Sequence, residues 1–278
     1  MACLSYCIFF AVWIILFMFG CAPVGPGYVP PDTPIPTRWN TPLENGLHAG
    51  KTNPENLARW WTVLGDPVLS NLMERATSGS LDLKEALARV GAARARRGLA
   101  RTDLFPILDA SGKVNRSKMG TRQTGGGEFQ TSYILGWDAG WELDIFGGVR
   151  RSVEAAQADL EAAAESLRDV LVTLLGEVAL NYLEVRTFQV RIGVAEANLE
   201  AQTETYILTR VKYEAGLSDE LAVQQARYNL ENTRSRLPSL RTGLEEALNR
   251  LAVLLGEHPG AVHEELKKQE IIPVVGRE

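Results

Sequence analysis

The chain has 278 residues, a formal net charge of −5 and a sequence pI of about 5.5. A nucleic-acid-binding protein normally carries a basic surface, so this acidic balance argues against a nucleic-acid partner. All three cysteines, Cys3, Cys7 and Cys21, lie in the N-terminal segment, and if Cys21 is processed the mature chain has no other thiol for disulfides, catalysis or metal binding.

The N-terminus predicts a secretory signal peptide over residues 1–20. Residues 8–19 form an almost unbroken apolar run, which is too short to span a bilayer comfortably but suits the core of a signal peptide. The Gly-Cys pair that ends at Cys21 resembles the lipobox of bacterial lipoproteins, in which the cysteine becomes the lipidated N-terminus. Two features depart from that pattern, because no Lys or Arg precedes the run and Met18 and Phe19 replace the usual residues. An uncleaved N-terminal anchor is the alternative.

Residues 21–60 are predicted to form an extended linker between a lipid anchor and a folded body at 61–278. Seven prolines lie between residues 22 and 42. Proline removes backbone donors and fixes φ, so this stretch has no core of its own. The resemblance to lipoprotein sorting signals implies the outer membrane, because Ala22 stands where an Asp would mark inner-membrane retention.

Two helical segments are predicted over residues 66–104. Asp66 is a good N-cap and Pro67 is favoured at the first helical position, and apolar residues then recur at helical spacing. The pattern ends before Pro106, because a proline disfavours helical geometry in the residue that precedes it.

A β-hairpin is predicted over residues 105–146, where the apolar period changes from 3.6 to 2. Two such strands, apolar on one face and polar on the other, match the pattern of a transmembrane β-barrel. A soluble hairpin packed on a helical domain is the alternative. The main apolar or aromatic positions are Leu108, Ala110, Val114, Tyr133, Leu135, Trp137, Ala139, Trp141, Leu143 and Ile145.

Three carboxylates lie on the polar face of this pattern: Asp138, Glu142 and Asp144. They suggest an acid/base pair, but their period of 2 favours residues that line a wet lumen, where they would favour cations. The sequence holds no His and Cys residues at metal-ligand spacing. We therefore expect neither catalysis nor a metal site.

A long helical hairpin is predicted over residues 150–256, followed by a short charged tail at 257–278. Apolar residues recur every seven positions over most of residues 164–213 and again over 223–251. A sustained seven-residue repeat forces a left-handed supercoil, because 3.6 residues per turn must be wound to 3.5. Pro238 is expected to kink the second helix. The predicted fold class is therefore mainly α, an antiparallel coiled-coil hairpin plus two transmembrane β-barrel strands.

The tip of the helical hairpin is predicted at about residues 214–221. Gly216 breaks the first helix, and Ser218 can cap the next one. Asp219 and Glu220 then fall in the first turn, where negative charge complements the helix dipole.

These segments together resemble the TolC/OprM family of outer-membrane efflux proteins, and specifically its NodT-type lipoproteins. The resemblance covers about residues 21–265 and includes five motifs in family order. They are GDPVLSNLMERA, LDLKEALARVGAARARRGLARTDLFP, WELDIFGGVRR, YEAGLSDELAVQQA and RLPSLRTGLEEALNRLAVLLGEHPG.

The resemblance implies a lipid-anchored outer-membrane channel that extends into the periplasm. It would be a component of a tripartite RND-type efflux system that exports small molecules or drugs, and it would have no cofactor beyond the lipid on Cys21. The hairpin tips would meet a periplasmic adaptor protein and an inner-membrane RND pump. The implied gate and adaptor residues are Tyr213, Gly216, Leu217, Ser218, Asp219, Glu220 and Leu221. The alternative is a non-transporting periplasmic coiled-coil lipoprotein that bridges envelope partners.

Two departures from the family qualify what is carried over. Ala222 stands three residues before Gln225, where the family usually has an acidic residue, so the gating network is not transferred. Family members are also about twice this length and form trimers with four strands per protomer. Three copies of two strands give six, whereas membrane barrels begin at about eight. The sequence therefore suggests either a truncated product or an assembly of six copies.

Overall fold

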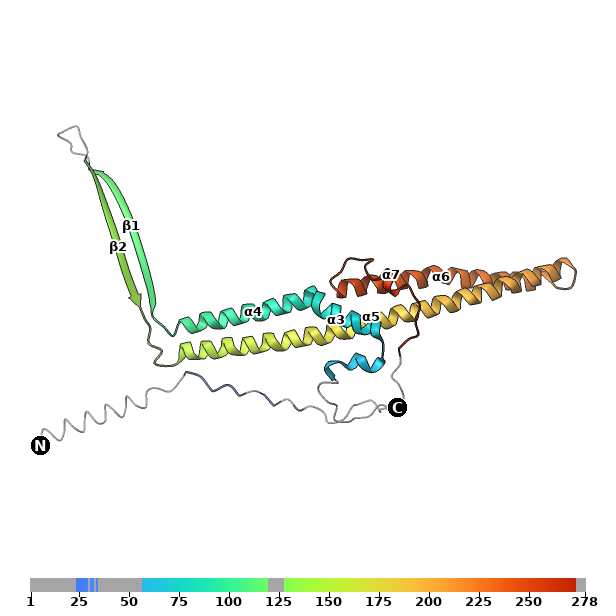
Figure 1. Ribbon diagram of the computed structural model, residues 1–278, viewed down its shortest axis with the longest axis horizontal. Coiled ribbons are helices and arrows are strands. Elements are labelled where there is room, and N and C mark those ends of the chain that lie inside the picture. The colour runs from blue at the N-terminus through green and yellow to red at the C-terminus, as the bar shows by residue number, and fades with distance from the viewer. Residues whose placement is uncertain (1–23, 30, 33, 35–56, 120–127, 274–278) are drawn as a thin grey trace. The chain divides into compact units, whose positions relative to one another are not determined.

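The computed structural model describes residues 24–29, 31–32, 34, 57–119 and 128–273 (Figure 1). The expected signal peptide, Cys21 and most of the expected linker lie outside these residues. The described elements are η1 (Trp60–Leu64), α3 (Pro67–Gly79), α4 (Leu81–Thr102), β1 (Ile107–Met119), β2 (Glu128–Gly140), α5 (Gly148–Glu214), α6 (Glu220–Leu254) and α7 (His263–Leu266).

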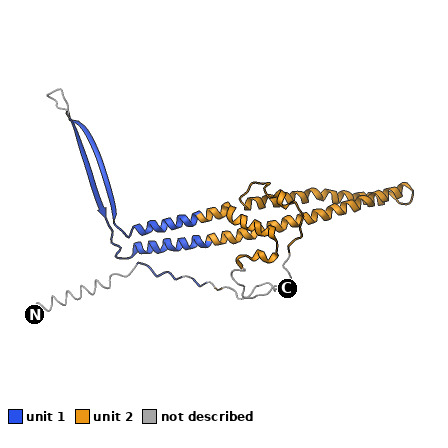
Figure 2. Ribbon diagram, in the orientation of Figure 1, with its two compact units in different colours: residues 1–32, 88–165 blue, residues 33–87, 166–278 orange. Residues whose placement is uncertain are grey.

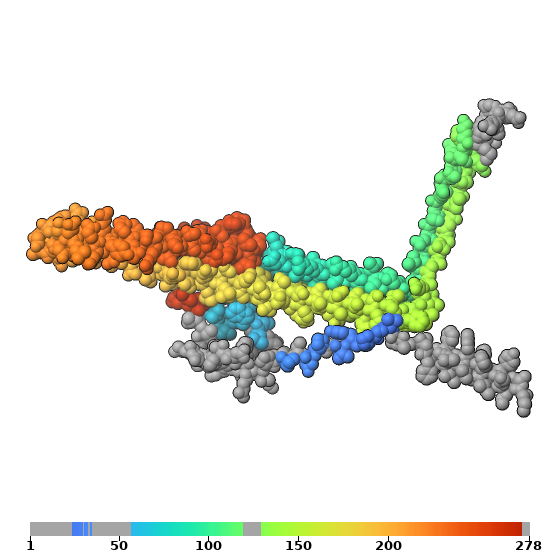
Figure 3. Space-filling view, turned by 180° about the vertical axis from the view of Figure 1, so that it is seen from behind, coloured from blue at the N-terminus to red at the C-terminus, as the bar shows by residue number. Residues whose placement is uncertain are grey.

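The chain divides into two compact units, which Figure 2 shows in different colours. Unit 1 comprises residues 1–32 and 88–165, and unit 2 comprises residues 33–87 and 166–278. The helices α4 and α5 contribute to both units. In unit 1, residues 88–102 of α4 lie beside the first part of α5, and the β-hairpin connects these two helices (Figures 1 and 3).

The start of α3 follows the expectation from the sequence. Asp66 is the N-cap, and its Oδ1 accepts hydrogen bonds from the backbone N–H groups of Val68 at 2.8 Å and Leu69 at 3.0 Å. Two of the N–H groups that have no acceptor within the helix are thereby satisfied. Pro67 occupies the first helical position, where its missing N–H costs nothing.

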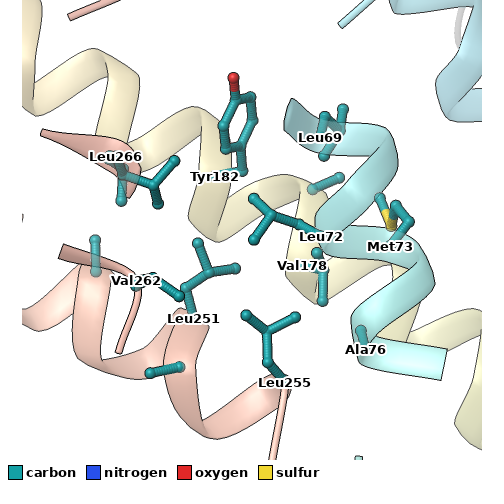
Figure 4. Close-up of a cluster of buried hydrophobic side chains, with 14 of the residues drawn as sticks. Leu69, Leu72, Met73, Ala76, Val178, Tyr182, Leu251, Leu255, Val262 and Leu266 are labelled. Atoms are coloured by element: carbon teal, nitrogen blue, oxygen red, sulfur yellow. The ribbon is translucent and has the colours of Figure 1, made fainter. Parts of the chain in front are cut away.

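The core of unit 2 brings α3, α5, α6 and the C-terminal tail together (Figure 4). Its side chains come from helical stripes in each element, as the apolar spacing predicts. Each fully buried leucine or valine contributes roughly 1.5–3 kcal/mol by leaving water. The residues with no exposed surface include Leu69, Leu72, Met73, Ala76, Val178, Tyr182, Val185, Leu251, Val262 and Leu266.

The helices α5 and α6 run side by side in unit 2 up to the tip that joins them (Figures 1 and 3). Arg241 pairs with Glu196 at 2.9 Å and Arg250 with Glu184, both across the two helices. These pairs are largely exposed, so packing of the apolar stripes contributes more to stability than they do. Pro238 lies inside α6, which continues beyond it to Leu254.

The predicted fold class is confirmed as mainly helical, with one antiparallel β-hairpin and two long antiparallel helices. Within the part of the chain that the structure describes, no helix combines the length and apolar character needed to cross a membrane.

The tail after α6 is more ordered than its charge suggests. Val262 and Leu266 are fully buried in the core of unit 2. The guanidinium of Arg75 on α3 donates to both carboxylate oxygens of Glu257, at 2.8 and 2.7 Å, and to Glu265 at 2.6 Å. Bidentate pairing of this kind is stronger than a single contact. The tail is therefore held to α3 by apolar and charged contacts together.

Tyr182 on α5 has no exposed surface, and its hydroxyl forms hydrogen bonds with two polar side chains. Its hydroxyl donates to Asp66 Oδ2 and accepts from Nε of Arg186 at 3.1 Å. Burial raises the pKa of Tyr182, the hydrogen bond to Asp66 raises it further, and Arg186 opposes both, with a net pKa of about 12.

We expect this shift to make the fold sensitive to alkali. Below pH 10 the tyrosine is neutral in both states, so its contribution to stability is complete. As the pH rises from 10 towards 12 the unfolded chain ionises first, which should cost about 2 kcal/mol by pH 11.5. The check is urea unfolding at several pH values in parallel with Tyr182→Phe, whose stability should fall less steeply above pH 10. Equal slopes for the two proteins would contradict the assignment.

Candidate functional site

The register of the β-hairpin puts most of the large apolar residues of both strands on the same face. Directly opposed residues of antiparallel strands share a face, and Leu108 opposes Ala139, Ala110 opposes Trp137, and Val114 opposes Tyr133. The apolar alternation seen separately in each strand therefore combines into one surface. We call this surface the apolar face of the hairpin, formed by Leu108, Ala110, Val114, Phe129, Tyr133, Leu135, Trp137 and Ala139.

This face has no covering element among the described residues. Tyr133 is 77% exposed, Leu135 76% and Trp137 69%. A water-soluble protein rarely leaves so many large apolar side chains in one exposed patch. The face is therefore suited to contact with lipid or with another protein.

Two basic residues approach the ring of Phe129 on this otherwise apolar face. Arg116 lies with its guanidinium 4.6 Å from the ring centroid, and the ammonium of Lys118 lies 5.4 Å from it. Cation–π contacts of this kind are weak at exposed sites. An aromatic ring with basic side chains at the end of an apolar surface is typical of a membrane–water interface.

The opposite face of the hairpin is mainly polar, although it also carries Ile107 and Ile134. Asp138 lies directly opposite Asp109, and Ser132 opposite Asn115. Two opposed carboxylates destabilise a strand pair unless water screens them. The opposed pair is therefore suited to an aqueous environment; that Asp138 lines a lumen stays a prediction. Sequence reasoning missed the pairing with Asp109, which only the register reveals.

The structure corrects the interpretation of Glu142 and Asp144. The strand β2 ends at Gly140, so neither residue belongs to it. Asp144 instead sits before α5, where Oδ1 accepts from the N–H of Val149 at 3.2 Å and Oδ2 from the N–H of Arg150 at 2.9 Å. The first N–H groups of a helix have no acceptor within it, and this carboxylate satisfies two of them.

The electrostatics of Asp144 agree with that structural role. Partial burial acts to raise the pKa of its carboxyl, but hydrogen bonds from the backbone of Arg150 and Val149, and from the Arg150 side chain, hold the pKa below its usual value. The carboxylate therefore stays charged at the helix start. We do not retain Asp144 as a residue of the polar face.

The tip between α5 and α6 is built around Gly216. Its φ is +75°, and its N–H donates to the carbonyl of Tyr213 at 2.9 Å. The N–H of Leu217 donates to the carbonyl of Lys212 at 2.8 Å. These two bonds form a Schellman motif, which ends a helix and favours glycine because of the left-handed conformation.

The cap of α6 is Asp219 rather than the expected Ser218. Oδ1 of Asp219 accepts from the N–H of Ala222 at 2.8 Å, and the helix begins at Glu220. Both side chains are good N-caps, so the position of the turn after Gly216 decides between them. The carboxylate of Asp219 therefore caps the start of α6.

The side chains that project from the tip are apolar as well as acidic. Leu217 is 79% exposed and Leu221 64%, and Tyr213 is also exposed. The structure brings all seven predicted tip residues into one short connection with its flanking turns. Exposed leucines at the end of a helical hairpin are suited to contact with a partner protein.

Comparison with known proteins gives a family match over most of the folded chain. Residues 72–257 match the family described as "Outer membrane efflux protein". The matched range contains the hairpin, α5, α6 and the tip.

Three individual relatives are similar along nearly all of the chain. "Nodulation protein T" of Rhizobium leguminosarum bv. trifolii is 31% identical over 261 residues, covering 91% of this chain and 53% of that protein. "Probable outer membrane lipoprotein SilC" of Salmonella typhimurium is 27% identical over 263 residues, covering 94% and 56%. The solved structure of the outer-membrane channel OprN is 33% identical, with a TM-score of 0.75, and covers 91% and 56%. The chain thus spans about half the length of the relatives it matches.

Proposed function

The chain belongs to the Outer membrane efflux protein family, as its sequence motifs predict, and from this we propose that it is the outer-membrane component of a tripartite RND-type efflux system. In this role it contributes to a channel through which small molecules or drugs leave the periplasm. The chain acts as a homo-oligomer, together with a periplasmic adaptor protein and an inner-membrane pump.

The observation that carries this proposal is the two-faced hairpin. Its apolar face is exposed on both strands, and its polar face sets Asp109 opposite Asp138. A strand pair with lipid on one side and water on the other has this distribution of residues. Asp138 then faces the aqueous pathway, where its charge favours cations.

Two further parts of the chain take roles that follow from this arrangement. Cys21 carries the lipid that anchors the mature N-terminus in the outer membrane, a role supported by the similarity to an outer-membrane lipoprotein. The tip around Gly216 meets the adaptor, and this is supported by the exposure of Leu217 and Leu221. The non-transporting alternative lacks an explanation for the exposed apolar face.

The test is to locate the chain and its tip contacts in a Gram-negative cell. A photo-reactive phenylalanine analogue replaces Leu217, and the cognate adaptor is co-expressed. We expect the chain in the outer-membrane fraction and a light-dependent cross-link to the adaptor, with no such link from the same analogue at Val253 on α6. A chain recovered from the soluble periplasm, or equal cross-linking from both positions, would contradict the proposal.

Within the same experiment, Gly216→Val is expected to lower the yield of the cross-link from position 217 to the adaptor about fivefold. A β-branched residue at φ +75° costs on the order of 1–2 kcal/mol, so the Schellman turn and the leucines beyond it should be displaced. The matched control is Gly216→Asn, because asparagine tolerates the left-handed conformation. Outer-membrane levels of both variants should stay unchanged, and equal cross-linking by the two would show that the turn does not matter.

A further inference from the structure

Val24 and Gly25 are held beside the segment that follows the β-hairpin by a defined set of contacts. The N–H of Val24 donates to the carbonyl of Phe146 at 2.9 Å. The guanidinium of Arg151 on α5 donates back to the carbonyl of Val24 at 3.1 Å and approaches that of Gly25 at 3.5 Å. Arg151 itself pairs with Glu154 one turn along α5.

These contacts lie in unit 1, at the chain segment between β2 and α5. Large apolar side chains are more than half exposed in this segment, namely Trp141, Leu143, Ile145 and Phe146, and so is Phe105, which lies between α4 and β1. The indole N–H of Trp141 donates to the carbonyl of Leu104 at 3.2 Å, so its polar end is satisfied while its ring remains exposed. Aromatic residues of this kind are enriched at membrane–water interfaces.

We propose that Arg151 and the carbonyl of Phe146 form a clamp on Val24 and Gly25 that sets the level of the acylated N-terminus relative to this apolar belt. The inference rests on the proposed lipidation of Cys21. Only Ala22 and Pro23 separate Cys21 from Val24, and the three residue-to-residue steps between them span at most about 11 Å. The clamp therefore makes the lipid and the belt enter the membrane at the same level.

The chemistry of the clamp explains why an arginine is suited to it. A guanidinium has several donors in a fixed plane, so one side chain can bind two successive carbonyls and a carboxylate at once. The proline-rich linker beyond residue 25 has few donors of its own. Arg151 is thus a positioning residue, which acts on the backbone of the N-terminal segment.

The test uses a disulfide between the clamped segments. In the full chain, Val24→Cys is combined with Phe146→Cys, and the lipidated Cys21 contributes no free thiol. A disulfide spans Cα separations of about 4.4–6.8 Å, a range that two residues joined by a backbone hydrogen bond can meet. Mild oxidation of outer-membrane preparations should link the two cysteines, detected by mass spectrometry after proteolysis.

The variant Arg151→Ala should lower the yield of this disulfide about fivefold, as expected for the loss of one or two exposed charge-assisted hydrogen bonds. Arg151→Lys should give an intermediate yield, because an ammonium keeps the charge without the planar donors. Arg227→Ala, on α6, is the matched control and should leave the yield unchanged. An unchanged yield in Arg151→Ala, or no disulfide with Arg151 present, would overturn the proposal.

A parallel measurement separates this inference from the proposed function. Incorporation of labelled palmitate should be lost in Cys21→Ser and retained in Arg151→Ala. If the disulfide forms but no label is incorporated, the proposed lipidation of Cys21 is wrong, and the clamp cannot set the level of a lipid. If the label is incorporated and the disulfide is absent, the clamp is wrong while the proposed function stands.

Discussion

Leu135→Arg is expected to reduce the membrane-integrated fraction of the chain at least tenfold, whereas Ser132→Arg should leave that fraction nearly unchanged. Leu135 lies near the middle of β2 on the apolar face, and Ser132 lies three residues away on the polar face. An arginine on the lipid face near the membrane midplane costs about 2–4 kcal/mol, and one on the aqueous face costs little. The two variants add the same side chain to the same strand, so only the face differs.

The measurement is the share of the chain that resists carbonate or urea extraction from purified outer membranes. Both substituted residues are exposed in the isolated chain, so neither change should disturb the core of unit 2. Helical content by circular dichroism checks that point independently. Equal loss in both variants would mean that the apolar face does not contact lipid. The central observation behind the proposed function would then fail.

The hairpin also shows how far periodicity alone can predict this structure. The alternation in each strand predicts which residues share a face, and the observed register pairs the two apolar sets with one another. The same alternation misplaces the end of β2, because Trp141 to Ile145 continue the pattern beyond Gly140. The alternation does not show that the first N–H groups of α5 lack acceptors within the helix. Asp144 leaves the strand pattern because its carboxylate accepts hydrogen bonds from two of these groups.

The tip between α5 and α6 likewise contains one feature that the sequence predicts and one that it does not. Gly216 is recognisable from sequence because few other residues adopt its φ of +75°. Ser218 and Asp219 are adjacent and equally good caps, so propensity does not separate them. The Schellman bond from Leu217 to Lys212 fixes where the chain leaves α5, and Asp219 is then the residue that reaches the next helix.

Local sequence patterns do not predict the hydrogen-bond network around Arg186. Arg186 follows Val185 of the apolar stripe in α5, and it is 1% exposed. Its hydrogen-bond partners in the tail, Lys268 and Glu270, are more than 80 residues away along the chain. Spacing rules reach only a few turns of helix, so a buried charge satisfied from this distance is visible only in three dimensions.

Replacing Arg186 by methionine is expected to destabilise unit 2 by about 2–3 kcal/mol, because the buried hydroxyl of Tyr182 and three part-buried groups lose their donor together. The guanidinium donates to the carbonyl of Lys268 at 2.7 Å, to Oε1 of Gln189 at 3.0 Å and to Oη of Tyr182 at 3.1 Å. It also pairs with Glu270 at 3.3 Å. Methionine fills a similar volume without any donor, so the loss reports the polar contacts rather than a cavity.

The same change should release the tail selectively. Without Arg186 the tail keeps Gln189, whose side-chain amide donates to the carbonyl of Leu266 at 2.6 Å, and the contacts of Arg75 with Glu257 and Glu265. These contacts precede residue 267, so residues 267–273 lose their main attachment. Limited proteolysis should therefore cleave that segment about tenfold faster, since local opening becomes easier by more than 1.4 kcal/mol.

The controls separate the buried network from charge alone. Arg241→Met removes an exposed arginine that pairs with Glu196, and such a pair contributes at most about 1 kcal/mol. Arg186→Lys keeps the charge but has one ammonium where the guanidinium binds four partners, so its stability should lie between the parent and Arg186→Met. Urea unfolding followed by circular dichroism gives the ranking. If Arg186→Met is no less stable than Arg241→Met, the network does not hold the tail, and the apolar contacts of Val262 and Leu266 are sufficient.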